Sequence, residues 1–187
     1  MSKRRWSTAL LAFLLVGYAA SLTTAQTCPC SIWSNAALPQ GIEQDPNAIE
    51  VGVRFRADVA GQITGLRFYK GAQNTGPHVG HLWTNNGQQL ASVTFTNETA
   101  SGWQQVSLPA PVAIAANTTY VASYHTTVGF YALTEPGFSA AVVNPPLQAL
   151  ADGADGPNGV YKYGASGFPT NTFNASNYWV DVVFTTP

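Results

Sequence analysis

The sequence predicts an all-β fold, an antiparallel β-sandwich. Apolar and polar residues alternate with a period of two in several short segments, which places the apolar residues of each segment on one face of a strand. Clusters of Gly, Asn and Pro separate these segments at short intervals. Short strands at such spacing are typical of sandwiches. We expect jelly-roll-like wiring, with an immunoglobulin-like sandwich as the alternative.

The clearest alternation opens the domain. Between residues 49 and 56, Ile, Val and Phe residues alternate with Glu, Gly and Arg residues. A turn-rich break at 58–61 separates this segment from a second alternating one at 66–69. Two alternating runs around a short Gly-containing turn favour an antiparallel hairpin.

A second hairpin is expected where Asn85-Asn86-Gly87 joins two alternating segments. Because the first and last strands are both long, we expect them to pair, with Arg54 opposite Asp181 as a cross-strand ion pair. The Gly-, Pro- and Asn-rich stretch at 135–176 is expected to be mainly loop. The strands expected after the opening hairpin lie at 79–84, 90–96, 103–108, 119–126, 130–133, around Tyr161 and Tyr163, and at 178–184.

Residues 1–25 have the features of a secretory signal peptide. Three basic residues precede an apolar run that is shorter than a membrane span, and small residues lead up to Ala25. We therefore expect a secreted protein without a membrane span in the mature chain. Its parts would be an irregular lead-in at 26–47 and one β-sandwich domain at 48–187.

The charge of the mature chain argues against nucleic acid as a partner. Removal of the predicted signal peptide leaves five Lys and Arg against nine Asp and Glu, a formal charge of −4. A nucleic-acid-binding domain needs a basic surface, which this composition cannot supply.

The two cysteines, Cys28 and Cys30, flank Pro29 in the lead-in. A zinc site needs about four ligands at suitable spacing, and the sequence offers no second pair. In an oxidising compartment we expect a disulfide, either between these two cysteines or to another chain, that anchors the lead-in.

Several segments of the sequence resemble those of a known protein family. They are Val-Gly-Val-Arg-Phe-Arg-Ala-Asp (51–58), Gly-Leu-Arg-Phe-Tyr-Lys-Gly (65–71), Asn-Glu-Thr-Ala-Ser-Gly-Trp-Gln-Gln-Val (97–106), Tyr-Val-Ala-Ser-Tyr-His (120–125) and Asn-Tyr-Trp-Val-Asp-Val-Val-Phe (177–184). Together they resemble the bacterial domain-of-unknown-function family 4082 over about 32–184. Members typically sit in secreted multidomain proteins beside immunoglobulin-like or carbohydrate-active modules. The resemblance implies a β-sandwich with an extracellular accessory role and transfers no catalytic residues.

The sequence does not predict an enzyme. It contains neither a Gly-x-Ser-x-Gly elbow nor a His-Glu-x-x-His zinc motif. His81 and His125 could meet across a sheet, but ordinary polar positions on a strand are the favoured interpretation. Glycoside hydrolysis needs two carboxylates facing each other, and Glu50 and Asp181 are better explained as partners of the arginines.

Carbohydrate binding is the sharper hypothesis. Sugar rings stack on exposed aromatic side chains while polar groups bond their hydroxyls. Alternation places Trp83 and Trp179 on the face of their strand opposite the apolar residues. His81 shares the face of Trp83, and Tyr69 shares a face with Arg67. On one sheet these five residues would form an aromatic platform for a polysaccharide or cell-surface glycan. The alternative is that each aromatic packs beneath the 135–176 segment.

A calcium site is a weaker hypothesis. Asp152, Asp155 and Asn158 bring oxygen ligands together in a turn-rich segment, and calcium prefers oxygen ligands. Asp-Gly and Asn-Gly pairs are also ordinary turn chemistry, which we favour.

We therefore expect a secreted, non-catalytic accessory domain that binds carbohydrate or mediates cell-surface adhesion. The alternative is a structural subunit of an extracellular layer or filament, which self-assembles through strand edges or the cysteine-containing lead-in.

Overall fold

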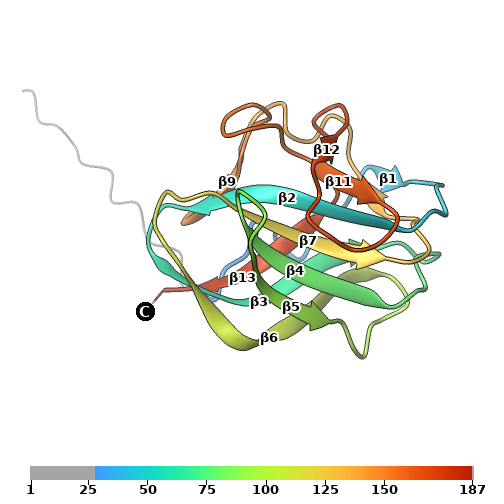
Figure 1. Ribbon diagram of the computed structural model, residues 1–187, viewed down its shortest axis with the longest axis horizontal. Coiled ribbons are helices and arrows are strands. Elements are labelled where there is room, and N and C mark those ends of the chain that lie inside the picture. The colour runs from blue at the N-terminus through green and yellow to red at the C-terminus, as the bar shows by residue number, and fades with distance from the viewer. Residues whose placement is uncertain (1–27, 187) are drawn as a thin grey trace, which may run out of the picture.

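The computed structural model describes residues 28–186, and the predicted signal peptide at 1–25 lies outside them. The described residues form thirteen strands and no helix, so this part of the chain contains no helix that could span a membrane (Figure 1). The strands are β1 (Gly41–Ile42), β2 (Ile49–Ala57), β3 (Gly61–Lys70), β4 (His78–Thr84), β5 (Gln89–Thr94), β6 (Gly102–Ile114), β7 (Tyr120–Thr126), β8 (Ala132–Leu133), β9 (Val142–Asn144), β10 (Leu147–Ala149), β11 (Val160–Tyr163), β12 (Asn171–Thr172) and β13 (Val180–Thr185).

Two antiparallel sheets form the sandwich that the alternation predicts. The larger sheet has the order β12-β11-β2-β7-β4-β5, and the β9–β10 hairpin pairs with the far end of β2. The smaller sheet has the order β13-β3-β6, and β1 pairs separately with β8. The all-β sandwich is therefore confirmed.

The core lies where the apolar faces of the two sheets meet. Ile49, Val51, Val53 and Phe55 of β2 are each at most 1% exposed. The ring of Phe68 from β3 stacks on Tyr124 of β7, with 4.1 Å between the ring centroids. The period of two thus identifies the buried face of β2 correctly.

The predicted pairing of the first two alternating segments is wrong. β2 pairs with β7, whereas β3 pairs with β13 and β6 in the other sheet. The short connection at 58–60 therefore crosses from one sheet to the other. β2 is hydrogen-bonded on both edges, to β7 on one side and to β10 and β11 on the other, which leaves no edge for β3.

The expected pairing of the first and last strands is also wrong, and with it the Arg54–Asp181 ion pair. β13 pairs with β3, where Asp181 lies opposite Arg67. The Arg54 guanidinium instead bonds the Pro157 carbonyl oxygen and the Asn85 side chain. Because the preference for jelly-roll wiring rests on pairing of the first and last strands, the structure removes that basis.

The hairpin predicted around Asn85-Asn86-Gly87 is present. β4 and β5 pair in antiparallel register on either side of this turn. Gly87 has a φ of +91°, which is in the left-handed region that glycine adopts most readily.

The 135–176 stretch contains more structure than expected. Four short strands, β9 to β12, lie within it, and β10 and β11 extend the larger sheet beyond β2. Between these two strands, the Asn158 side chain takes the place of a strand. Its Oδ1 accepts from the Arg54 backbone N at 2.8 Å and its Nδ2 donates to the Arg54 carbonyl oxygen at 3.0 Å.

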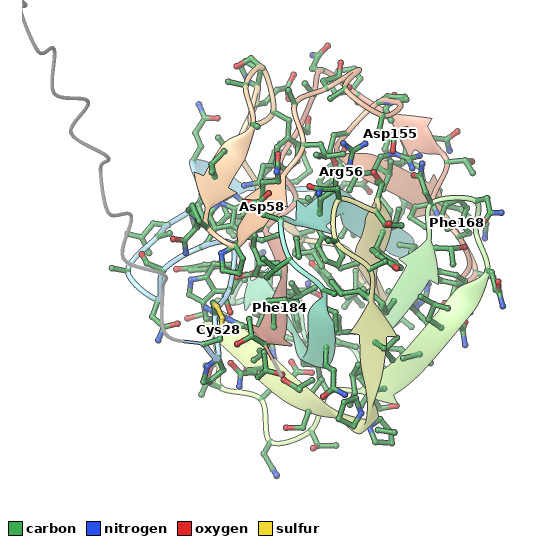
Figure 2. All side chains as sticks on the ribbon, turned by 90° about the vertical axis from the view of Figure 1, so that its left-hand side faces the viewer. Cys28, Arg56, Asp58, Asp155, Phe168 and Phe184 are labelled. Atoms are coloured by element: carbon green, nitrogen blue, oxygen red, sulfur yellow. A yellow bond between two sulfur atoms is a disulfide. The ribbon has the colours of Figure 1, made fainter. Side chains whose placement is uncertain are left out.

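The lead-in is tied to the end of β13. Cys28 and Cys30 form a disulfide with each other, and the backbone of Cys30 exchanges two hydrogen bonds with Phe184 at 2.9 and 2.8 Å. Figure 2 shows Cys28 close to Phe184. Both cysteines are thus used within one chain.

The buried carboxylate of Asp181 in β13 connects the lead-in with β13 and β3. Asp181 accepts from the backbone N of Ile32 at 2.8 Å, of Val182 at 2.7 Å and of Trp33 at 3.3 Å. The Arg67 Nη1 lies 3.6 Å from its Oδ2. Burial raises the pKa of Asp181 to about 6, while Arg67 and the three N–H groups oppose the rise. The side chain is therefore ionised at neutral pH.

Replacing Asp181 will destabilise the fold. Asp181→Asn removes the charge opposite the buried Arg67 and points an NH₂ group at existing donors, so we expect a loss of about 3 kcal/mol in the free energy of unfolding. Denaturant unfolding at neutral pH measures this loss. Asp58→Asn is the matched control, because Asp58 is exposed and should change stability by no more than about 0.5 kcal/mol. Equal effects of the two substitutions would contradict the prediction.

Candidate functional site: a tyrosine-lined cleft

Two of the five predicted binding residues lie on the outer face of the larger sheet. His81 and Trp83 project from β4 on the face opposite the core, as predicted, but they are only 5% and 6% exposed. The Phe168 ring covers Trp83, with centroids 5.6 Å apart (Figure 2 labels Phe168). This pair is thus packed beneath the segment that follows β11.

A buried polar network fixes that face. Trp83 Nε1 donates to Ser123 Oγ at 2.7 Å, and Ser123 Oγ donates to Glu50 Oε1 at 2.6 Å. His81 Nδ1 lies 2.9 Å from the same Glu50 oxygen, and Ser166 Oγ donates to Oε2 at 2.9 Å. Glu50 is fully buried. Ser123 is fully buried as well, and its hydroxyl points to the carboxylate and not to the histidine, so these buried polar groups satisfy one another.

The other three predicted residues lie on the outer face of the smaller sheet. Arg67, Tyr69 and Trp179 join Trp33 from the lead-in and Trp103 from β6 in an aromatic cluster. The Arg67 guanidinium carbon lies 4.5 Å from the centre of the Trp103 ring. Trp179 is 6% exposed, and its Nε1 donates to Thr134 Oγ1 at 3.0 Å.

The predicted single platform is therefore wrong as a geometric unit. The five residues fall on two sheets, and each group is covered, by the 164–168 segment on one face and by the lead-in on the other. Alternation assigns a side chain to a face of its strand, but it does not tell what covers that face.

The three residues of the predicted calcium site all have protein partners. Asp155 bonds Arg56 Nη2 at 2.9 Å and accepts from Thr119, and Figure 2 shows Arg56 and Asp155 side by side. Asp152 Oδ1 accepts from the Asn158 N at 2.8 Å. The Asn158 amide is occupied by Arg54 and Leu150. Within residues 28–186, no group of three or more His, Cys, Asp and Glu is arranged to hold a metal ion.

The structure instead has a cleft at one end of the larger sheet, where short strands from distant parts of the sequence meet. Figure 1 shows β1, β11 and β12 gathered at this end. The cleft has a volume of about 280 Å³. Its lining consists of aromatic and acidic residues with one serine and one leucine: Glu43, Asp45, Tyr131, Leu133, Glu135, Tyr161, Tyr163, Phe173, Ser176 and Tyr178.

Backbone pairing holds the walls in place. β1 pairs with β8, and Glu43 N donates to the Tyr131 carbonyl oxygen at 2.9 Å. β11 pairs with β2 and β12, and the alternation of β11 puts Tyr161 and Tyr163 on one face. Paired strands thus carry Leu133, Tyr161 and Tyr163, while the acids, Phe173 and Tyr178 lie in the segments that connect the strands.

Four tyrosines line the cleft at steep angles to one another. The ring planes of Tyr131 and Tyr178 meet at 75°, as do those of Tyr161 and Tyr163, and the Tyr161 and Tyr178 planes meet at 73°. Tyr131 and Tyr178 form the buried floor, and burial raises the pKa of both hydroxyl groups. On the rim, Tyr163 is 47% and Phe173 is 55% exposed.

The cleft continues at both ends along the surface. One continuation shares Leu133 and Glu135 with the cleft and adds Gln40, Pro136 and Asn174. The other shares Asp45 and Tyr163 and adds Asn47, Ala48 and Gly164. Together they form an extended groove in which amide side chains flank the central tyrosines.

This site is not predicted from the sequence. Its residues come from four stretches, 43–45, 131–135, 161–163 and 173–178. The one local signal is Tyr161-Lys162-Tyr163, which places two tyrosines on the same face of a strand in an otherwise polar region.

Comparison with protein-family profiles identifies a family. The sequence profile of a domain of unknown function (DUF4082) matches residues 36–180, a range that includes every residue of the cleft. No curated protein matches the chain.

Trp83 supports the fold, so its removal should cost stability. Trp83→Ala deletes a buried ring and leaves Ser123 without its donor, and we expect a loss of about 3–5 kcal/mol in the free energy of unfolding. Phe173→Ala is the matched control, since it removes an exposed ring and should leave stability nearly unchanged. A Trp83→Ala protein as stable as the control would show that the ring is not part of the packed structure.

Calcium should not affect thermal stability. The oxygens of Asp152, Asp155 and Asn158 already accept hydrogen bonds within the protein, so we expect the same Tm with added calcium and with EDTA. Differential scanning calorimetry of residues 26–187 is the measurement. A Tm that rises with calcium and falls with EDTA would re-establish the metal site.

Proposed function

The chain belongs to the DUF4082 family of domains of unknown function, and we propose that it acts outside the cell as a non-catalytic carbohydrate-binding module for adhesion to polysaccharides or cell-surface glycans. The observation that carries this proposal is the tyrosine-lined cleft with its flanking groove. Ligand sites are typically concave, aromatic and provided with a few polar groups that fix orientation.

The chemistry of the cleft suits a sugar chain. A pyranose ring has apolar C–H faces that pack on tyrosine rings, and its hydroxyls need hydrogen-bonding partners. The cleft supplies the rings, and Gln40, Asn47 and Asn174 along the groove supply amide donors and acceptors. A groove open at both ends accepts an internal stretch of a polysaccharide.

The acidic residues of the cleft support binding more than hydrolysis. A glycosidase general acid needs a raised pKa. The Tyr163 hydroxyl donates to Asp45 and holds the pKa of that carboxyl below its usual range. An assay for newly released reducing ends tests this part of the proposal, and sustained release that depends on Glu43 or Glu135 would overturn it.

Substitution of the rim will test the binding site. Tyr163→Ala and Phe173→Ala remove exposed rings, so they should preserve Tm while weakening retention on a polysaccharide column by at least about tenfold. Val143→Ala is the control, because Val143 is 59% exposed and outside the cleft. Retention that survives both rim substitutions would move the site elsewhere.

The same preparation tests the alternative of a structural subunit. Light scattering during size-exclusion chromatography should give a monomer for a binding module and ligand-free assemblies for a structural subunit. Cys28→Ser with Cys30→Ser should leave the monomer unchanged, because the two cysteines bond each other within one chain.

A further inference from the structure

The tyrosine cleft is acidic, and its acids lack cationic partners among the described residues. Glu43, Asp45 and Glu135 line it, while no Lys, Arg or His does. None of the five ion pairs formed within residues 28–186 includes any of the three. In a domain with so few charged residues, three carboxylates at one cleft are a concentrated negative charge.

Neutral groups orient these carboxylates without cancelling their charge. Asp45 accepts from the Tyr163 hydroxyl and from the Asn47 N at 2.9 Å. Glu135 accepts from Asn174 Nδ2, and Glu43 accepts from the Gln44 N at 3.0 Å. A ligand that enters the cleft therefore meets a negative potential.

The nearest lysine in the sequence points away from the cleft. Lys162 lies between Tyr161 and Tyr163 on β11, so its side chain leaves from the opposite face of the strand. Its Nζ donates to the Ala165 carbonyl oxygen. β11 thus presents its two tyrosines to the cleft, while the ammonium group of Lys162 lies on the other face of the strand.

Tyrosine faces add a second preference for positive charge. A cation is attracted to the negative face of an aromatic ring, and rings set at steep angles let several faces and edges surround one group. The T-shaped contacts of Tyr131, Tyr161, Tyr163 and Tyr178 provide such an enclosure beside the carboxylates.

We propose that the cleft recognises a protonated amine on a sugar chain, so that the preferred ligand is a polysaccharide with unacetylated amino-sugar units. This inference rests on the proposed carbohydrate-binding function and narrows its ligand class. The amine would lie among the tyrosines and carboxylates, and neighbouring sugars would follow the groove past Gln40 and Asn174 or past Asn47.

The groove favours a sugar chain over a free amine or a basic peptide. A small amine would need only the central cleft, whereas amide-bearing surface continues on both sides of it. A peptide that adds to a sheet needs a long unpaired strand edge, whereas the edges at this end are short: β12 has two residues, and β11 leaves only Lys162 and Tyr163 unpaired beside it.

Calorimetric titration with matched sugars will test the inference. We use a glucosamine oligomer and its fully N-acetylated form, of equal length and linkage, at mildly acidic pH where the amines are charged. We expect the amine form to bind at least about tenfold more tightly. Glu43→Gln with Glu135→Gln should abolish this difference, whereas Asp58→Asn, which removes an exposed charge outside the cleft, should retain it.

Each contrary outcome has a distinct meaning. If the N-acetylated or another neutral glycan binds as tightly and depends on Tyr163, the carbohydrate function stands and the amine preference is wrong. If an oligolysine of matched charge or glucosamine itself binds as tightly as the oligomer, the ligand class is wrong. If no glycan of a broad panel binds, the proposed function fails together with the inference.

Discussion

The fold depends on the carboxylate of Asp181, which is buried and must be satisfied by fixed donors. Two of its donors belong to the lead-in, one to β13, and its charge partner Arg67 to β3. The lead-in is thus part of the packed domain and not a tether in front of it. The position of Arg67 in turn sets the place of Trp103, over which the guanidinium lies, and so organises the aromatic cluster on the smaller sheet.

The aromatic residues predicted to form a platform are packed against other segments on both sheets. The lead-in packs on Trp179 of the smaller sheet, and the segment after β11 packs on Trp83 and the Glu50 network of the larger one. The tyrosine-lined cleft lies at the end of the larger sheet, where the 131–135 and 173–178 segments meet β1 and β11. There, β11 holds Tyr161 and Tyr163 in place, and the Tyr163 ring remains open to solvent above the buried Tyr131 and Tyr178.

Local pattern predicted the strands well and their partners poorly. Alternation located β2, β4, β7 and β11 and the core-facing side of β2, and the Asn-Asn-Gly turn predicted the β4–β5 hairpin. It could not tell that β2 and β3 lie in different sheets, because a short connection serves a hairpin and a crossing equally. Local pattern could not predict the cleft either, because its acids and tyrosines are brought together by contacts between segments far apart in the sequence, such as Glu43 with Tyr131 and Thr134 with Asn177.

The Asn158 side chain completes the edge of β2 between β10 and β11, so the segment between these two strands can change in length without loss of the sheet. The residues at 151–157 leave the sheet and return to it while β10, β11 and Asn158 keep their hydrogen bonds to β2. Gly153 and Ala154 are exposed at the tip of this excursion. Extra sequence accommodated between them would lengthen a surface loop without opening the sheet. In this chain the position is therefore a site where length and composition can change, and where a foreign epitope or label can be displayed.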